Sequence, residues 1–148
     1  MSPHPESARQ RPNPAPAAVG GGCPFCELPP GSIVEQNQHA LALRDRYPLA
    51  QGHVLVIPRR HVGSPFDLGP EELASVWSLV AQVRQSIAAE RSPDGFTIGV
   101  NDGAAAGQTV MHAHVHVIPR WNGDVADPRG GIRWVIPARA PYWDGPAR

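Results

Sequence analysis

Three histidines alternate with small or β-branched residues in the stretch 107–120, which reads Gly-Gln-Thr-Val-Met-His-Ala-His-Val-His-Val-Ile-Pro-Arg. Successive side chains of a β-strand point to opposite faces, so His112, His114 and His116 would share one face, each about 6.8 Å from the next. Near neutral pH an imidazole serves as a nucleophile, a proton donor or a metal ligand. The spacing therefore favours a chemical role over a polar outer face. A purely metal-binding trio is the alternative, although the strand lacks the carboxylates that many hydrolytic metal centres use.

The residues between the histidines predict how this strand is held. Ala113, Val115 and Val117 are small or β-branched, which suits packing beneath a helix. Alternating or β-branched apolar runs bounded by turn residues predict the other strands of the same sheet. The five predicted strands lie at 33–36, 39–44, 53–57, 96–101 and 111–118. Pro58 would end the third of them, because proline donates no hydrogen bond to a ladder.

One helix is predicted between the third and fourth strands. Pro70 fits the first turn of a helix, and Glu71 and Glu72 suit the positive end of its dipole. The turn at 92–95 would end it. An apolar stripe at helical spacing consists of Leu73, Val76, Trp77, Val80, Val83 and Ile87. The order of elements predicts an α+β fold, with one long helix packed on an antiparallel five-stranded sheet.

The composition limits the classes of protein to which the chain can belong. Its 148 residues suit one domain, and 13 arginines balance 13 acidic residues, which argues against a nucleic-acid partner. The absence of lysine excludes Schiff-base chemistry and a phosphate-loop lysine. No apolar run approaches the roughly 18 residues of a membrane span, and the N-terminus carries no secretory apolar core. We therefore expect a cytoplasmic protein with no membrane partner.

Three segments differ in composition. Residues 1–22 are rich in proline, alanine and glycine with almost no large apolar side chain, so we expect a disordered tail. Residues 23–120 contain all the predicted elements. Residues 121–148 form a C-terminal arm in which Arg129 and Arg133 could bind an anion. We favour the alternative that the tryptophans of the arm pack on the arm itself or on a partner subunit.

The run 112–118, His-Ala-His-Val-His-Val-Ile, resembles the signature of the histidine triad (HIT) superfamily. The segments 52–58, 101–103 and 107–110 match the pattern of the same family in order and spacing. The resemblance covers 23–120. It implies the HIT-like fold, nucleotide binding and a reaction at the α-phosphate of the nucleotide. Many members are homodimers whose sheets join edge to edge, so the resemblance also implies a homodimer.

The resemblance implies a role for individual residues. His114 would be the nucleophile that forms a nucleotidyl-imidazole intermediate, His116 would donate to a phosphate oxygen, and His53 would support the triad from the neighbouring strand. The substrate-binding positions would be Asp45, for the ribose hydroxyls, and Asn101, Gln108 and Thr109, for phosphate or bridging oxygens. These polar residues also fit ordinary turns, which is the plain alternative.

Cys23 and Cys26 are the only cysteines and form a Cys-Pro-Phe-Cys motif. A redox pair usually follows a strand and opens a helix that lowers the thiol pKa, but glycines precede this pair and 27–31 cannot continue a helix. A zinc site needs two further ligands. The resemblance supplies them at His61 and His112, which implies a closed, structural zinc site that clamps the N-terminal segment against the histidine strand.

The resemblance implies a HIT-type nucleotide hydrolase acting on dinucleoside polyphosphates or nucleoside phosphoramidates. Two alternatives stay open: a nucleotidyltransferase or phosphorylase that uses the same intermediate, and a noncatalytic nucleotide-binding module. A redox role would need a reversible Cys23–Cys26 disulfide. Phe25, Leu28 and Leu43 are candidates for the base pocket, although core packing explains them equally well.

Overall fold

The computed structural model describes residues 22–143 of the chain. Within this range the strands are β1 (Ile33–Gln36), β2 (Ala40–Arg44), β3 (Val54–Pro58), β4 (Gly95–Val100) and β5 (Val115–Arg120), and the α-helix is α1 (Pro70–Arg91). All neighbouring strands are antiparallel, in the order β1-β2-β3-β5-β4. The predicted α+β fold is therefore confirmed. The predicted tail lies outside the described residues, apart from Gly22.

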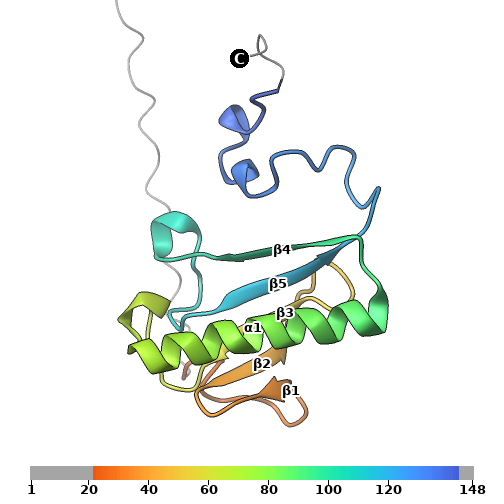
Figure 1. Ribbon diagram of the computed structural model, residues 1–148. Coiled ribbons are helices and arrows are strands. Elements are labelled where there is room, and N and C mark those ends of the chain that lie inside the picture. The colour runs from red at the N-terminus through yellow and green to blue at the C-terminus, as the bar shows by residue number, and fades with distance from the viewer. Residues whose placement is uncertain (1–21, 144–148) are drawn as a thin grey trace, which may run out of the picture.

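Helix α1 lies across one face of the sheet, as Figure 1 shows. Pro70 occupies its first turn, and the Oε2 of Glu72 accepts the N–H of Gly69 at 3.1 Å. The helix stops at Ser92, whose backbone turns left-handed with φ of 49° and whose N–H donates to the carbonyl of Ala88. The helix therefore begins and ends where the proline, the acidic residues and the turn predict.

The core fills the space between α1 and the sheet. Its most buried members from the sheet and the helix include Val56, Val115, Val117, Val76, Leu79 and Val83. The predicted helical stripe is wrong at Trp77, which is 46% exposed, whereas Leu79 is 0% exposed. Leu79 lies three residues after Val76 and four before Val83, so it shares their face of the helix. A bulky aromatic residue at the border of the stripe stays at the surface.

The opposite face of the sheet carries a smaller apolar cluster. Leu41, Leu43 and Ile57 are buried there, and Phe25 and Leu28 of the N-terminal segment pack against them. Side chains alternate along a strand, so β3 supplies its valines to the core beneath α1 and its leucine and isoleucine to this face. The histidines lie on this second face.

The histidine strand is shorter than predicted, because β5 begins one residue after His114. The stretch before it bonds to the end of β3 and to the loop that follows. The N–H of Ala113 donates to the carbonyl of Val62 at 2.7 Å, and the Nε2–H of His112 donates to the carbonyl of Pro58 at 2.8 Å. His112 and His114 therefore lie before the strand ladder, and the backbone around them is attached to the end of β3 and to the loop that follows it.

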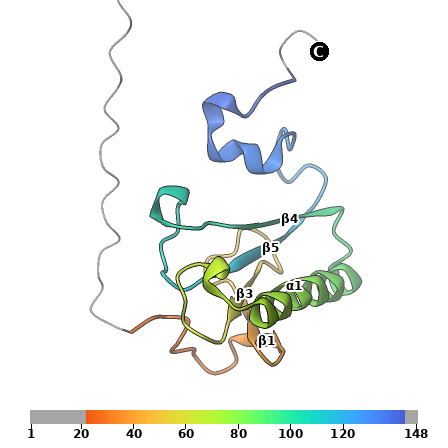
Figure 2. The ribbon, with the colours of Figure 1, turned by 60° about the vertical axis from the view of Figure 1, so that its left-hand side comes forward.

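The C-terminal arm lies beyond β4, the sheet edge opposite β1, in both views (Figures 1 and 2). Arg133 donates to two backbone carbonyls of the arm and lies over the ring of Tyr142, 4.9 Å from its centre. The rings of Trp134 and Trp143 are 6.5 Å apart. These side chains therefore pack on the arm itself. In the part of the chain that the structure describes, no helix has the length and apolar character to cross a membrane.

Candidate active site

Three histidines gather on the second face of the sheet. His53 lies directly before β3, His116 lies on the adjacent β5, and their ring centres are 5.2 Å apart. The ring of His114 is 5.1 Å from that of His116. His53 is 3% exposed and His114 is 8% exposed, so both are largely withdrawn from water. The fold thus brings together the residues predicted to do chemistry, while their roles stay predictions.

Hydrogen bonds determine which nitrogen of His53 carries its proton. The Nδ1 of His53 accepts the N–H of Leu49 at 3.1 Å, so the proton of the neutral ring is on Nε2. That nitrogen lies 3.0 Å from the Nδ1 of His116 and 3.3 Å from the Oδ2 of Asp45. The Nδ1 of His116 therefore accepts a hydrogen bond. The proton of His116 is then on Nε2, where it remains available to a ligand.

A backbone carbonyl determines the tautomer of His114. Its Nδ1 lies 2.8 Å from the carbonyl oxygen of His112, and because a carbonyl only accepts, this nitrogen carries the proton. The Nε2 of the neutral ring then keeps its lone pair. An unprotonated ring nitrogen is the nucleophilic form of imidazole. The local backbone thus holds His114 in a tautomer that is capable of attacking an electrophile.

Burial favours the neutral form of two of these imidazoles, His116 and His53. The pKa of His116 is lowered to about 4, first by burial and then by the neighbouring His114 and His53. Burial also lowers the pKa of His53, against the opposing effect of the Asp45 carboxylate. At neutral pH, His116 is therefore a neutral N–H donor and carries no positive charge.

The lowered pKa of His116 predicts a pH dependence of stability. The unfolded chain binds this proton below about pH 6.5 and the folded protein only below about pH 4, so stability is lost as the pH falls through that window. We expect a loss of about 2 kcal/mol between pH 7.5 and pH 5 from this group. Urea unfolding at both pH values measures it, and the variant His116→Gln should lack this part of the loss. An equal loss in both proteins would contradict the assignment.

The histidines open onto a cavity of about 650 Å³. Phe25, Leu28 and Leu43 form an apolar part of its wall, and Asn101 and Thr109 line it from the segment between β4 and β5. Its volume falls within the roughly 300–1,000 Å³ of small-molecule sites. The cavity thus combines an apolar wall with polar groups and imidazoles, which suits a ligand with a flat apolar part and a charged part.

Gln108, between Gly107 and Thr109 of the cavity wall, does not itself line the cavity and is already engaged by the protein. It is 4% exposed, and its Oε1 accepts the N–H of Gly103 at 2.8 Å. Its Nε2 donates to the carbonyls of Gly63 and Val110 at 2.8 and 3.0 Å. Both of its N–H donors are therefore used to hold the neighbouring loops together. Its contact with phosphate stays a prediction.

The turn that follows β2 contributes more to the cavity than the sequence indicated. Asp45 lines the cavity and accepts the N–H of Tyr47 at 2.8 Å. Tyr47 and Leu49 also line it, although they are 81% and 78% exposed. Sequence reasoning missed this pair. Two large apolar residues on either side of a proline in a turn are the signal that could have identified them.

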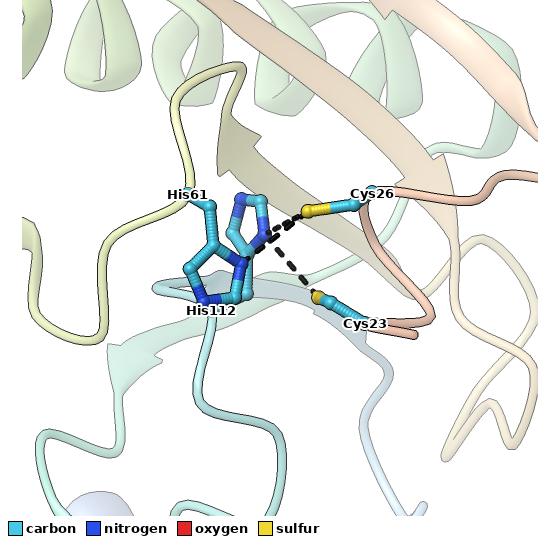
Figure 3. Close-up of side chains that lie close together, drawn as sticks. All are labelled: Cys23, Cys26, His61 and His112. Carbon is cyan, nitrogen blue, oxygen red and sulfur yellow. Dashed lines mark hydrogen bonds between the residues drawn. The ribbon is translucent and has the colours of Figure 1, made fainter. Parts of the chain in front are cut away.

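A second cluster lies beside the first and is formed by Cys23, Cys26, His61 and His112 (Figure 3). The Sγ of Cys26 is 3.3 Å from the Nδ1 of His61 and 3.6 Å from the Nδ1 of His112. The Sγ of Cys23 is 3.5 Å from the Nδ1 of His112. All four ligand atoms lie within 4.8 Å of one another. Two thiols and two imidazoles are a common donor set for metals, so these residues could hold a metal ion.

The tautomer of His112 agrees with a metal-binding role. Its Nε2–H donates to the carbonyl of Pro58, which leaves the Nδ1 lone pair directed at the thiols. The three triad histidines do not form a metal-binding group together among residues 22–143. His112 turns toward the cysteines, while His116 is paired with His53. The alternative of a metal-binding histidine trio therefore lacks geometric support.

The HIT domain family matches residues 29–123, and the chain belongs to this family. An uncharacterized HIT-like protein of Mycoplasma genitalium is 37% identical over 103 residues, which are 67% of this chain and 73% of that protein. The asymmetrical bis(5'-nucleosyl)-tetraphosphatase of Schizosaccharomyces pombe is 40% identical over 104 residues, which are 70% of this chain and 57% of that protein.

Two further relatives come from mycobacteria. The AP-4-A phosphorylase of Mycobacterium tuberculosis is 36% identical over 107 residues, which are 68% of this chain and 55% of that protein. The crystal structure of a Zn-bound histidine triad family protein from Mycobacterium smegmatis matches with a TM-score of 0.65 and 34% identity. The match covers 71% of this chain and 79% of that one. The Mycobacterium smegmatis structure shares the fold, and the names of the Schizosaccharomyces pombe and Mycobacterium tuberculosis relatives state two different activities.

Proposed function

We propose that this protein is a nucleotide hydrolase that cleaves at the α-phosphate through a nucleotidyl intermediate on His114. One observation carries the proposal. The Nδ1 of His114 donates to the carbonyl of His112, so its Nε2 keeps a lone pair, and the same ring lines the 650 Å³ cavity. The relatives named as a bis(5'-nucleosyl)-tetraphosphatase and an AP-4-A phosphorylase support a nucleotide as the substrate.

The first half-reaction is an in-line displacement at phosphorus. The Nε2 of His114 forms a bond to the α-phosphorus, and the bond from phosphorus to the leaving group breaks with its electron pair. Water then attacks the same phosphorus, which releases the nucleoside monophosphate and restores the imidazole. The Nε2–H of His116 donates to a phosphate oxygen, and the hydrogen bond from His53 holds His116 in that tautomer.

The leaving group has no obvious acid among the triad histidines. The Nε2–H of His112 is committed to the carbonyl of Pro58, and its Nδ1 faces the thiols. Another group or solvent must therefore protonate the leaving group, or the leaving group must be stable without a proton. A polyphosphate leaves as a stable anion, which favours phosphoanhydride substrates such as dinucleoside polyphosphates. Nucleoside phosphoramidates are the second candidate.

The remaining predicted residues would orient the nucleotide. A carboxylate offers about four acceptor sites, so Asp45 can accept ribose hydroxyls in addition to the N–H of Tyr47. Asn101 and Thr109 line the cavity and would donate to phosphate oxygens, with Gln108 bracing the loop beside them. The base would lie against the apolar wall, which consists of Phe25, Leu28 and Leu43.

Zinc is the metal that fits the cysteine and histidine cluster. A tetrahedral zinc ion with bonds of about 2.3 Å to sulfur and about 2.1 Å to nitrogen holds these atoms about 3.6 Å apart. Three of the four sulfur–nitrogen distances in the cluster are 3.3, 3.5 and 3.6 Å. Cys23, Cys26, His61 and His112 would fill all four positions, so the ion would cross-link the chain and leave no site for substrate. The Zn-bound relative supports this choice of metal.

A homodimer remains part of the proposal. Strand β4 ends the sheet, and all six of its residues are only half-buried, although residues 131–135 of the arm contact this strand. An edge strand offers unpaired backbone groups to a second copy. The family resemblance implies that two copies join their sheets in this way.

A phosphorylase is the second candidate function, favoured by the relative with that name. One assay distinguishes the activities: the purified protein is incubated with diadenosine tetraphosphate and, separately, with adenosine phosphoramidate, each with and without inorganic phosphate. We expect AMP from both substrates under both conditions and a larger kcat/KM for the tetraphosphate. ADP that forms only when phosphate is present would identify a phosphorylase. Tight binding without turnover would identify a noncatalytic module.

A further inference from the structure

Phe25 connects the metal-binding cluster to the candidate nucleophile. It lies between the two cysteines in the sequence, and its ring meets those of His112 and His114 edge-on at centre distances of 5.8 and 5.3 Å. It also lines the cavity. One side chain therefore contacts a proposed metal ligand, the proposed nucleophile and the space meant for the nucleotide.

His112 provides a second connection between the two clusters. Its side-chain Nδ1 faces both thiols, while its backbone carbonyl accepts the Nδ1–H of His114 at 2.8 Å. Any change that moves this residue relative to the cysteines would also change the hydrogen bond that holds the nucleophile. The metal-binding cluster and the candidate active site thus share His112, the first through its side chain and the second through its backbone carbonyl.

The thiols are the main polar attachment of the segment 23–28. Among the described residues, the hydrogen bonds that leave this segment for the rest of the chain are those from Cys23 and Cys26 to His61 and His112. Its other hydrogen bonds are within the turn, from the N–H of residues 26 and 27 to a carbonyl of the same segment. Apart from these, the segment is held by apolar packing of two side chains. Ligation of the thiols would therefore decide how firmly Phe25 is seated.

We infer that metal binding at the four-residue cluster and nucleotide binding in the cavity are coupled through Phe25. The bound metal seats Phe25 as a wall of the cavity, and a nucleotide that packs on Phe25 in turn favours the metal-bound arrangement. This inference rests on the proposed function. Coupling between two sites is reciprocal, so each ligand must raise the affinity for the other by the same factor.

The test measures both affinities on the full-length protein, with zinc as the metal and AMP as a ligand that undergoes no turnover. Competition with a colorimetric chelator gives the zinc Kd with and without AMP, and calorimetry gives the AMP Kd with and without zinc. We expect each ligand to lower the Kd of the other by a factor of about five or more. In Phe25→Ala this factor, by which each ligand changes the Kd of the other, should fall toward one. In Phe25→Leu the factor should lie between those of Phe25→Ala and the wild-type protein. Phe66→Ala, which removes an exposed phenylalanine outside the cavity, should keep the full factor.

The possible failures are distinguishable. If zinc and AMP both bind the wild-type protein but neither changes the affinity for the other, the coupling is wrong and the proposed function stands. If the factor is unchanged in Phe25→Ala, the coupling does not pass through this residue and the inference is overturned. If AMP does not bind the zinc-loaded wild-type protein, the proposed function fails and the inference fails with it.

Discussion

Replacing His114 with alanine is expected to abolish turnover of diadenosine tetraphosphate, with kcat falling by roughly four orders of magnitude or more. The variant removes the Nε2 whose lone pair is left free by the bond from Nδ1 to the His112 carbonyl. No other described histidine that lines the cavity keeps a free lone pair, because the Nδ1 of His53 accepts from Leu49, the Nδ1 of His116 accepts from His53, and both Nε2 atoms carry protons. Steady-state kinetics measures the loss.

The same variant should fail to trap the intermediate. Acid quenching of the wild-type protein with labelled substrate should leave the nucleotide on the protein, and His114→Ala should leave none. His39→Ala is the matched control, since His39 follows β1 and does not line the cavity. It should retain wild-type kinetics and labelling. Turnover at the wild-type rate in His114→Ala would refute the mechanism.

The sequence predicted the elements well where side-chain periodicity and capping agree. The helix begins at Pro70, with acidic residues in its first turn, and ends just before the left-handed Ser92. The five strands form the expected antiparallel sheet, because their apolar runs are separated by clear turn residues. The error at Trp77 arose because periodicity alone does not distinguish the centre of an apolar face from its border.

The candidate site was only partly predictable, because its chemistry depends on contacts between distant segments. The alternation of histidines indicated a shared face. It could not show that a bond from Ala113 to Val62 replaces the strand ladder before β5. Nor could it show the tautomers, which depend on the carbonyls of Pro58 and His112. These hydrogen bonds join residues whose spacing in the sequence follows no pattern from which the contact could be predicted.

Replacing His61, an exposed residue that we propose as a zinc ligand, is expected to weaken zinc binding and destabilise the fold. His61→Ala leaves three ligands, and a closed structural zinc site needs four. Its ring lies beside that of His112, with centres 5.0 Å apart, but it does not line the cavity. Loss of zinc can therefore be separated from loss of a substrate contact. Metal analysis of protein purified without added zinc should find about one zinc per chain in the wild type and far less in the variant.

The stability change follows from ligand linkage. Zinc at about a thousand times its Kd stabilises the folded state by about 4 kcal/mol. In a domain of this size, loss of the site should therefore lower the Tm by about 10 °C or more. His61→Cys is the matched control, because three thiols and one imidazole also form a zinc site, so zinc content and most of the Tm should return. Full zinc content and an unchanged Tm in His61→Ala would contradict the proposed structural zinc site. Free reaction of both Cys23 and Cys26 with a thiol reagent in the wild-type protein would lead to the same conclusion, because thiolates bound to zinc are shielded from such reagents.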